Sequence, residues 1–137
     1  MTVEISHDEI TQVRNLIFEL NSEQAGVVVV EGKRDSYALK NLGCSKEILE
    51  FHSFCGITKF ADSVSDCKNL IILFDSDRKG RYLTRRVIDQ LERRAKINLS
   101  YKKRLNKIAN GRIRAVEEMS KYAEFLGPLA PVGIRTA

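Results

Sequence analysis

An apolar run that changes abruptly into charged residues constrains this chain more than any other feature. Residues 70–74 are all apolar, and they are followed at once by Asp75, Ser76 and Asp77 and then by three cations within residues 78–81. Unbroken apolar runs of this length are typical of strands buried on both faces of a parallel sheet. The run therefore predicts a strand over 70–75 whose polar end lies at the carboxyl edge, where α/β sheets bind ligands.

The two acids after this strand allow two interpretations. In an extended chain Asp75 and Asp77 point to the same side, and two carboxylates so placed can share one Mg²⁺ ion. The same residues also fit a strand-end turn in which Asp77 is the N-cap of a helix that continues past Gly80. These residues alone leave both interpretations open.

A second strand end repeats the pattern and favours the metal. Residues 27–30 are four valines, followed by Glu31, Gly32 and two cations. Parallel strands would bring Glu31 toward Asp75 and Asp77, and three carboxylates at one edge repel one another unless a cation lies between them. We therefore expect Glu31, Asp75 and Asp77 to form a metal site for Mg²⁺, with Mn²⁺ as the alternative.

Two motifs at these strand ends resemble those of the Toprim domain. They are Glu31-Gly32-x-x-Asp35 after the first strand and Asp75-x-Asp77-x-x-Gly80 after the third. The likeness covers residues 25–100 and is nearest to short stand-alone archaeal Toprim proteins. It implies an α/β, Rossmann-like fold, with a mostly parallel four-stranded sheet flanked by helices. Topoisomerases, bacterial-type primases, OLD-family nucleases, RecR-type recombination proteins and a ribosomal RNA maturase share this domain.

The resemblance also implies roles for individual residues. It makes Glu31 the general acid or base, Asp75 and Asp77 the Mg²⁺ ligands, and Asp35 a supporting residue behind the site. The chain departs from many Toprim enzymes at Arg81, where those enzymes carry an acid. This departure argues against a two-metal mechanism and favours phosphate binding at that position.

Charge is distributed very unevenly along the chain. Residues 1–77 carry 7 Lys and Arg against 13 Asp and Glu, whereas residues 78–137 carry 16 against 5. A basic half directly after an acidic site suits a nucleic acid, RNA or DNA, although Lys- and Arg-rich helices are often only solvated surface. The residues expected to contact phosphate, including the start of the helix after Gly32, are Gly32, Lys33, Arg34, Arg78, Lys79, Arg81 and Arg85.

The rest of the chain predicts alternating helices and strands. We expect an N-terminal helix capped by Ser6 and Glu9 within residues 1–24, a Toprim domain over 25–100 and a basic helical extension over 101–137, all in one compact unit. The expected elements are helices over 33–41, 57–65, 80–94, 101–109 and 113–126 and strands over 48–52 and 96–99. Residues 110–111 should interrupt the last two helices, and residues 127–133 should not be helical.

Cysteine, histidine and hydropathy patterns are less specific. The three cysteines lack zinc or redox spacing, so we expect reduced, partly buried side chains, and we assign neither His7 nor His52 a catalytic role. The sequence shows no signal peptide and no apolar run long enough to span a membrane. We therefore expect a cytoplasmic protein without a membrane partner.

These features lead to one leading hypothesis for function and one alternative. The first is a Mg²⁺-dependent protein that acts on nucleic-acid phosphodiesters, most simply a nuclease or a factor in RNA processing or DNA repair. The alternative is a non-catalytic nucleic-acid-binding module or subunit that works with a protein partner. Topoisomerase activity would need a tyrosine from another domain, because Tyr82 is expected to be packed. A haloacid-dehalogenase-type phosphatase would leave Glu31 and Gly32 unexplained.

Overall fold

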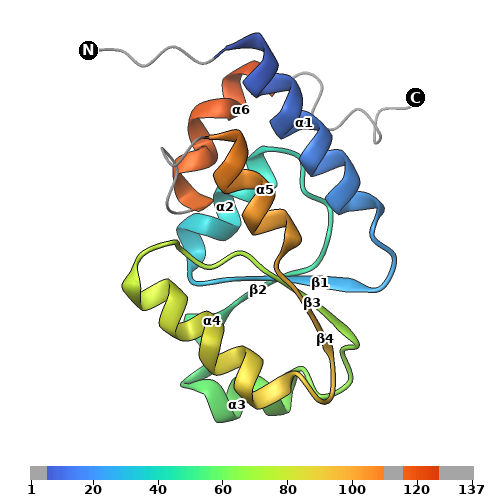
Figure 1. Ribbon diagram of the computed structural model, residues 1–137, viewed down its shortest axis with the longest axis vertical. Helices are drawn as coiled ribbons and strands as arrows, with labels where there is room; N and C mark the ends of the chain where they lie inside the picture. Colours follow the sequence, from blue (N-terminus) through green and yellow to red (C-terminus); the bar gives the residue numbers. More distant parts are fainter. Residues whose placement is uncertain (1–5, 110–115, 127–137) are drawn as a thin grey trace.

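A four-stranded sheet forms the centre of the computed structural model, which describes residues 6–109 and 116–126 (Figure 1). The strand order is β2-β1-β3-β4, and every pair is parallel, so the predicted α/β class is confirmed. The expected edge strand after residue 95 is present and lies beside β3. The strands are β1 (Gly26–Val30), β2 (Ile48–Glu50), β3 (Asn69–Ile72) and β4 (Lys96–Asn98).

Helices cover both faces of the sheet (Figure 1). One face carries α1 (His7–Ser22), α2 (Lys33–Asn41), α5 (Ser100–Ile108) and α6 (Ser120–Leu126). The other face carries α3 (Ile57–Ser63) and α4 (Arg78–Leu91). Two short 3₁₀ helices complete the described elements, η1 (Phe51–Phe54) and η2 (Val116–Met119).

The two central strands are apolar throughout because each of their faces is covered. In β1, Val28 and Val30 belong to the core under α1, whereas Val29 belongs to the core over α3 and α4. The same alternation runs through β3 and the two residues after it, since Ile71 and Leu73 join the first core and Ile72 and Phe74 the second. The chain is therefore still extended at Phe74, although regular strand pairing ends at Ile72.

The structure corrects several local predictions. The strand expected over 48–52 ends at Glu50, because the chain turns into η1 and then into Cys55, which has a left-handed backbone with φ 55°. This turn directs Phe51 into the core against Phe60 and Phe74.

The three cysteines differ in exposure. Cys55 is exposed, whereas Cys44 is buried and Cys67 half-buried, and all three are free thiols. Tyr37 of α2 is 67% exposed.

The N-terminal and C-terminal helices pack together on one face of the sheet. Arg104 of α5 forms an ion pair with Glu19 of α1 at 2.8 Å, and the Tyr101 hydroxyl donates to the Glu23 carboxylate at 2.5 Å. Ser6 caps α1 as expected by accepting from the Glu9 N–H at 3.0 Å. The Glu9 side chain does not complete a capping box, because it is buried and accepts a hydrogen bond from the Tyr122 hydroxyl of α6.

The helix predicted over 113–126 is described from residue 116 onward, where η2 precedes α6. The interruption at 110–111 and the tail over 127–133 lie outside the described residues. Within the described part of the chain, no helix is long and apolar enough to cross a membrane.

Candidate metal centre

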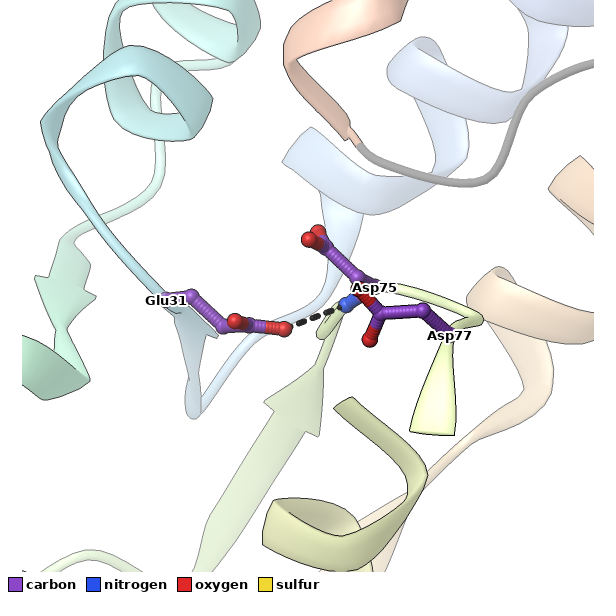
Figure 2. Close-up of side chains that lie close together, drawn as sticks. All are labelled: Glu31, Asp75 and Asp77. Carbon is purple, nitrogen blue, oxygen red and sulfur yellow. Dashed lines mark hydrogen bonds between the residues drawn. The ribbon is translucent and has the colours of Figure 1, made fainter. Parts of the chain in front are cut away.

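Three carboxylates meet at the carboxyl edge of the sheet. Glu31 follows β1, Asp75 lies in the loop after β3, and Asp77 precedes α4; each offers an oxygen, and these oxygens lie within 4.8 Å of one another (Figure 2). The three residues differ in solvent exposure: Glu31 is buried, Asp75 is half-buried and Asp77 is exposed. A cation placed among them would have a protein wall on one side and solvent on the other.

Backbone hydrogen bonds and one glycine fix this geometry. The Asp75 N–H donates to Oε2 of Glu31 at 2.7 Å, which ties the ends of two neighbouring strands together (Figure 2). The Gly80 N–H donates to Oδ1 of Asp77 at 2.7 Å, so Asp77 is the N-cap of α4 as well as a member of the acidic group. The N-cap interpretation of Asp77 is therefore confirmed, and the same carboxylate also lies in the acidic group.

Gly80 explains the spacing of the second motif. A Cβ atom at this position would lie 2.0 Å from the Asp75 carbonyl oxygen and 2.6 Å from its carbonyl carbon. No side chain fits there without moving the backbone that carries Asp75. The first turn of α4 can approach the acidic loop this closely only because residue 80 is glycine.

The electrostatics of Asp75 favour a bound cation. Burial, followed by repulsion from Glu31, raises the pKa of Asp75 to about 7. Its Oδ1 atom is buried and has no hydrogen-bond partner among the described residues. An orphaned buried oxygen near two other carboxylates costs free energy unless a cation binds it, and carboxylate oxygens are the ligands that Mg²⁺ and Mn²⁺ prefer. The donor set therefore fits a hard divalent ion.

Lys102 of α5 lies at the same edge, although no sequence motif predicts it there. Its charge attracts those of Asp75, Asp35 and Glu31, and burial lowers the pKa of its ammonium group against that attraction. Lys102 and Asp75 line the same pocket. The strand order places Lys102 at this edge. Because β4 lies beside β3, the helix that follows β4 must begin near the end of β3.

His52 is a second residue that lies beside the acidic group although its sequence pattern does not predict it there. Its Nε2 atom lies 3.8 Å from Oε1 of Glu31, and its backbone N–H donates to the Glu31 carbonyl oxygen at 3.0 Å. The pairing of β2 with β1 thus continues one hydrogen bond beyond β2 and places the imidazole beside the buried carboxylate. A proton on either side chain would be within reach of the other through a small movement or one water.

Asp35 lies behind the acidic group, buried at the start of α2. Its Oδ2 atom accepts from the Gly32 N–H at 3.2 Å, and its Oδ1 atom accepts from the Glu117 N–H of η2 at 2.9 Å. The carboxylate thereby links the loop after Glu31 to a segment 82 residues further along the chain. Its negative charge also contributes to raising the pKa of Asp75.

The predicted phosphate contacts fall in different places. Arg81 and Arg85 line a pocket with Asp75, and the Arg81 guanidinium donates to the Ser76 carbonyl oxygen at 3.0 Å. Lys33 and Arg34 line a separate open hollow of about 440 Å³ against η2, where Arg34 lies 4.0 Å from Glu117. Gly32 N-caps α2, and Arg78 and Lys79 are exposed in the first turn of α4.

Tyr82 does not pack as predicted. Its side chain is 57% exposed on α4, and the Arg86 guanidinium lies 5.8 Å from the centre of its ring. The helical period explains the difference, because Val87 and Leu91 occupy the buried face of α4 and residue 82 falls on the opposite side.

The comparisons with known proteins agree with this fold. A family model described as the Toprim domain matches residues 26–117. The UPF0292 protein of Archaeoglobus fulgidus is 38% identical over 104 residues, which are 75% of this chain and 81% of that protein. The UPF0292 protein of Pyrococcus furiosus is 33% identical over 110 residues, which are 80% of this chain and 83% of that protein.

A solved structure supports the same fold. A protein of Aquifex aeolicus aligns with a TM-score of 0.64 over 76% of this chain and 94% of its own length. The two sequences are 22% identical, so this likeness concerns the fold alone.

Proposed function

We propose that this chain, which belongs to the Toprim family, is a Mg²⁺- or Mn²⁺-dependent protein that acts on the phosphodiesters of a nucleic acid. The reaction class is phosphodiester cleavage, as in a nuclease or an RNA- or DNA-processing factor. The observation that carries the proposal is the group formed by Glu31, Asp75 and Asp77, in which one buried oxygen of Asp75 has no hydrogen-bond partner in the described chain.

Each side chain has a role that follows from its position. Asp75 and Asp77 would hold the ion, with one oxygen of Glu31 beside them. The ion, when bound, neutralises charge on a phosphodiester and stabilises the oxygens that attack and leave. Glu31 is the proton-transfer group, because it is the most buried of the three and its Oε1 atom faces His52 at 3.8 Å.

Cations around the acidic group support binding of a polyanion. Arg81 and Arg85 on α4 and Lys102 on α5 line the pocket that Asp75 also lines. They hold positive charge at the edge where three carboxylates would otherwise repel a phosphate. Lys102 has a further role, because the charge of its ammonium group offsets part of the negative charge of Asp75, Asp35 and Glu31.

The experiment that tests this function is a cleavage assay with matched variants. The purified chain is incubated with labelled structured RNA, single-stranded DNA and duplex DNA in Mg²⁺, Mn²⁺ or EDTA. Asp75→Asn and Glu31→Gln remove one charge each from the site, and Asp62→Asn removes one from an exposed position on α3. We expect metal-dependent cleavage by the parent chain and by Asp62→Asn, and a loss of at least about 100-fold in the two site variants.

A second candidate is a nucleic-acid-binding module without turnover. Arg81 and Lys102 favour it, because two cations already accompany the acids and a polyanion could dock on them without chemistry. Salt-dependent binding that survives EDTA, with no cleavage of any substrate by any form of the chain, would replace the nuclease proposal with this one.

A further inference from the structure

A groove opens beside the acidic group, between α4 and α5. It has a volume of about 420 Å³ and begins at Asp75. Pockets that hold small organic ligands have volumes of about 300 to 1,000 Å³, so the groove has room for one such molecule and not for a folded element. We name it the α4–α5 groove. Its floor is apolar: Ile88 and Leu99 are half-buried there, and the almost fully buried Ile72 and Phe74 lie at its base.

The groove exists because the edge strand is short. The last pair in the register of β3 and β4 joins Ile71 to Asn98, where β4 ends. Beyond that pair, no strand of the described residues lies on this side of the extended chain from Ile72 to Phe74. The helices that follow β3 and β4 lie on opposite faces of the sheet (Figure 1), and residues of both helices line the groove.

The rim of the groove is strongly basic and carries groups that can hydrogen-bond a planar polar ring. Arg81 and Arg85 come from α4, and Lys102 and Lys103 come from α5. Asn106 also lines the groove and accepts a hydrogen bond from the Ser76 hydroxyl at 3.2 Å. An apolar floor, a cationic rim and an amide match the three parts of a nucleotide, which are the base faces, the phosphate and the base edge.

We propose that the α4–α5 groove binds a single unpaired nucleotide of the substrate, with its base on the apolar floor and its phosphate directed toward Asp75. This proposal rests on the proposed function, because it names the part of the nucleic acid that lies next to the bond acted on. A base that is stacked in a duplex cannot enter a groove of this size without leaving its partner. The substrate class is therefore single-stranded nucleic acid, or an unpaired end or loop.

The first test uses single nucleotides without any metal. AMP and UMP are titrated into ¹⁵N-labelled protein in EDTA, and the backbone amide resonances are followed. We expect shifts that saturate at Thr84, Ile88, Leu99 and Asn106, which line the groove. Shifts confined to residues around Lys33 and Arg34, or no shifts at millimolar nucleotide, would overturn the proposal.

The second test compares strands and uses two pairs of matched variants. Anisotropy in EDTA measures the affinity for a labelled single strand, as RNA and as DNA, and for a blunt duplex of the same sequence. We expect the single strand to bind at least about tenfold more tightly, because a duplex must first unpair. Arg85→Glu and Lys103→Glu should weaken single-strand binding by about tenfold or more, since each reverses a charge on the rim.

The control variants change two cations outside the groove, one residue after Arg85 and four residues after Lys103. Arg86→Glu and Lys107→Glu make the same charge change at exposed positions on the same two helices. They should weaken binding by less than about threefold. Equal losses in the rim and control variants, or tighter binding of the duplex, would show that charge alone attracts the nucleic acid and that the groove holds no base.

These outcomes separate the groove from the chemistry. Metal-dependent cleavage of duplex DNA together with duplex-preferring binding would leave the proposed function standing and contradict the groove. Binding of a single strand through the rim residues without cleavage by any metal would support the groove and contradict the nuclease.

Discussion

The backbone N–H of Asp75 donates to the Glu31 carboxylate over 2.7 Å, so one acidic group of the site also holds its neighbour in place. This bond joins the ends of β1 and β3, which are neighbours in the sheet although 44 residues separate the two side chains along the sequence. Glu31 therefore has a structural role that is independent of any metal, and variants at this position can separate the two roles.

Two substitutions at Glu31 should differ in stability. Glu31→Gln keeps an oxygen that accepts from the Asp75 N–H, whereas Glu31→Ala leaves that donor without its partner. We expect the Gln variant to be more stable than the Ala variant by about 1 to 3 kcal/mol, the cost of an unsatisfied buried donor. Urea unfolding in EDTA measures this difference. Equal free energies of unfolding would mean that the bond contributes nothing to the fold.

Two glycine substitutions should also differ. Gly80→Ala places a Cβ atom 2.0 Å from the Asp75 carbonyl oxygen, so the loop must move, and we expect a loss of about 1 to 3 kcal/mol in unfolding free energy. Gly32→Ala is the matched control, because the nearest atom to its Cβ is 3.8 Å away and its φ is −147°. The control should change stability by less than about 0.5 kcal/mol. Equal effects of the two changes would refute the close approach.

The raised pKa of Asp75 predicts a pH dependence of stability without metal. Burial and the charge of Glu31 raise the pKa of Asp75 from 3.8 to about 7. Between these values the folded chain binds more protons than the unfolded chain, so this group makes the free energy of unfolding fall as pH rises from about 4 to about 7. Asp75→Asn removes that contribution.

Urea unfolding of both forms at pH 5 and pH 8 in EDTA isolates this effect. The parent chain should lose more stability than Asp75→Asn as the pH rises. Addition of Mg²⁺ at pH 8 should stabilise the parent chain more than the variant, because a bound ion offsets the repulsion among the carboxylates. Parallel pH profiles would show that Asp75 is not perturbed in the folded protein.

A buried hydroxyl tests whether α6 belongs to the same folding unit as α1. The Tyr122 hydroxyl donates to the Glu9 carboxylate, and both side chains are buried. Tyr122→Phe removes that donor, and we expect a loss of about 1 to 3 kcal/mol in a single unfolding transition. Tyr37→Phe, at an exposed tyrosine, should have little effect. Two separate transitions in the parent chain would contradict the proposal that residues 101–137 and 1–24 form one compact unit with the Toprim domain.

The sequence predicted the order of elements well because burial on two faces leaves a strong local signal. The valines of 27–30 and the apolar run of 70–74 could hardly form anything except central strands, and each is followed by acids at the predicted edge. The α4 helix was also clear from its apolar spacing, although Tyr82 was placed on the wrong side of it.

Residues that reach the site from distant elements were much harder to predict. Lys102 comes from the helix after a strand of three residues, and nothing in its local pattern marks it as facing Asp75. His52 reaches Glu31 because the chain turns directly after β2, where an extended strand was expected. Both depend on strand order and on where a strand stops, which the local sequence encodes weakly.

Binding of Mn²⁺ is the most direct test of the central claim, because it requires no knowledge of the substrate. Electron paramagnetic resonance of free Mn²⁺, titrated with protein at pH 8, gives the number of ions bound per chain. We predict one ion for the parent chain and for Asp62→Asn, and at least about tenfold weaker binding for Asp75→Asn and Glu31→Gln. Equal binding by all four proteins, or by none, would contradict a metal centre formed by Glu31, Asp75 and Asp77.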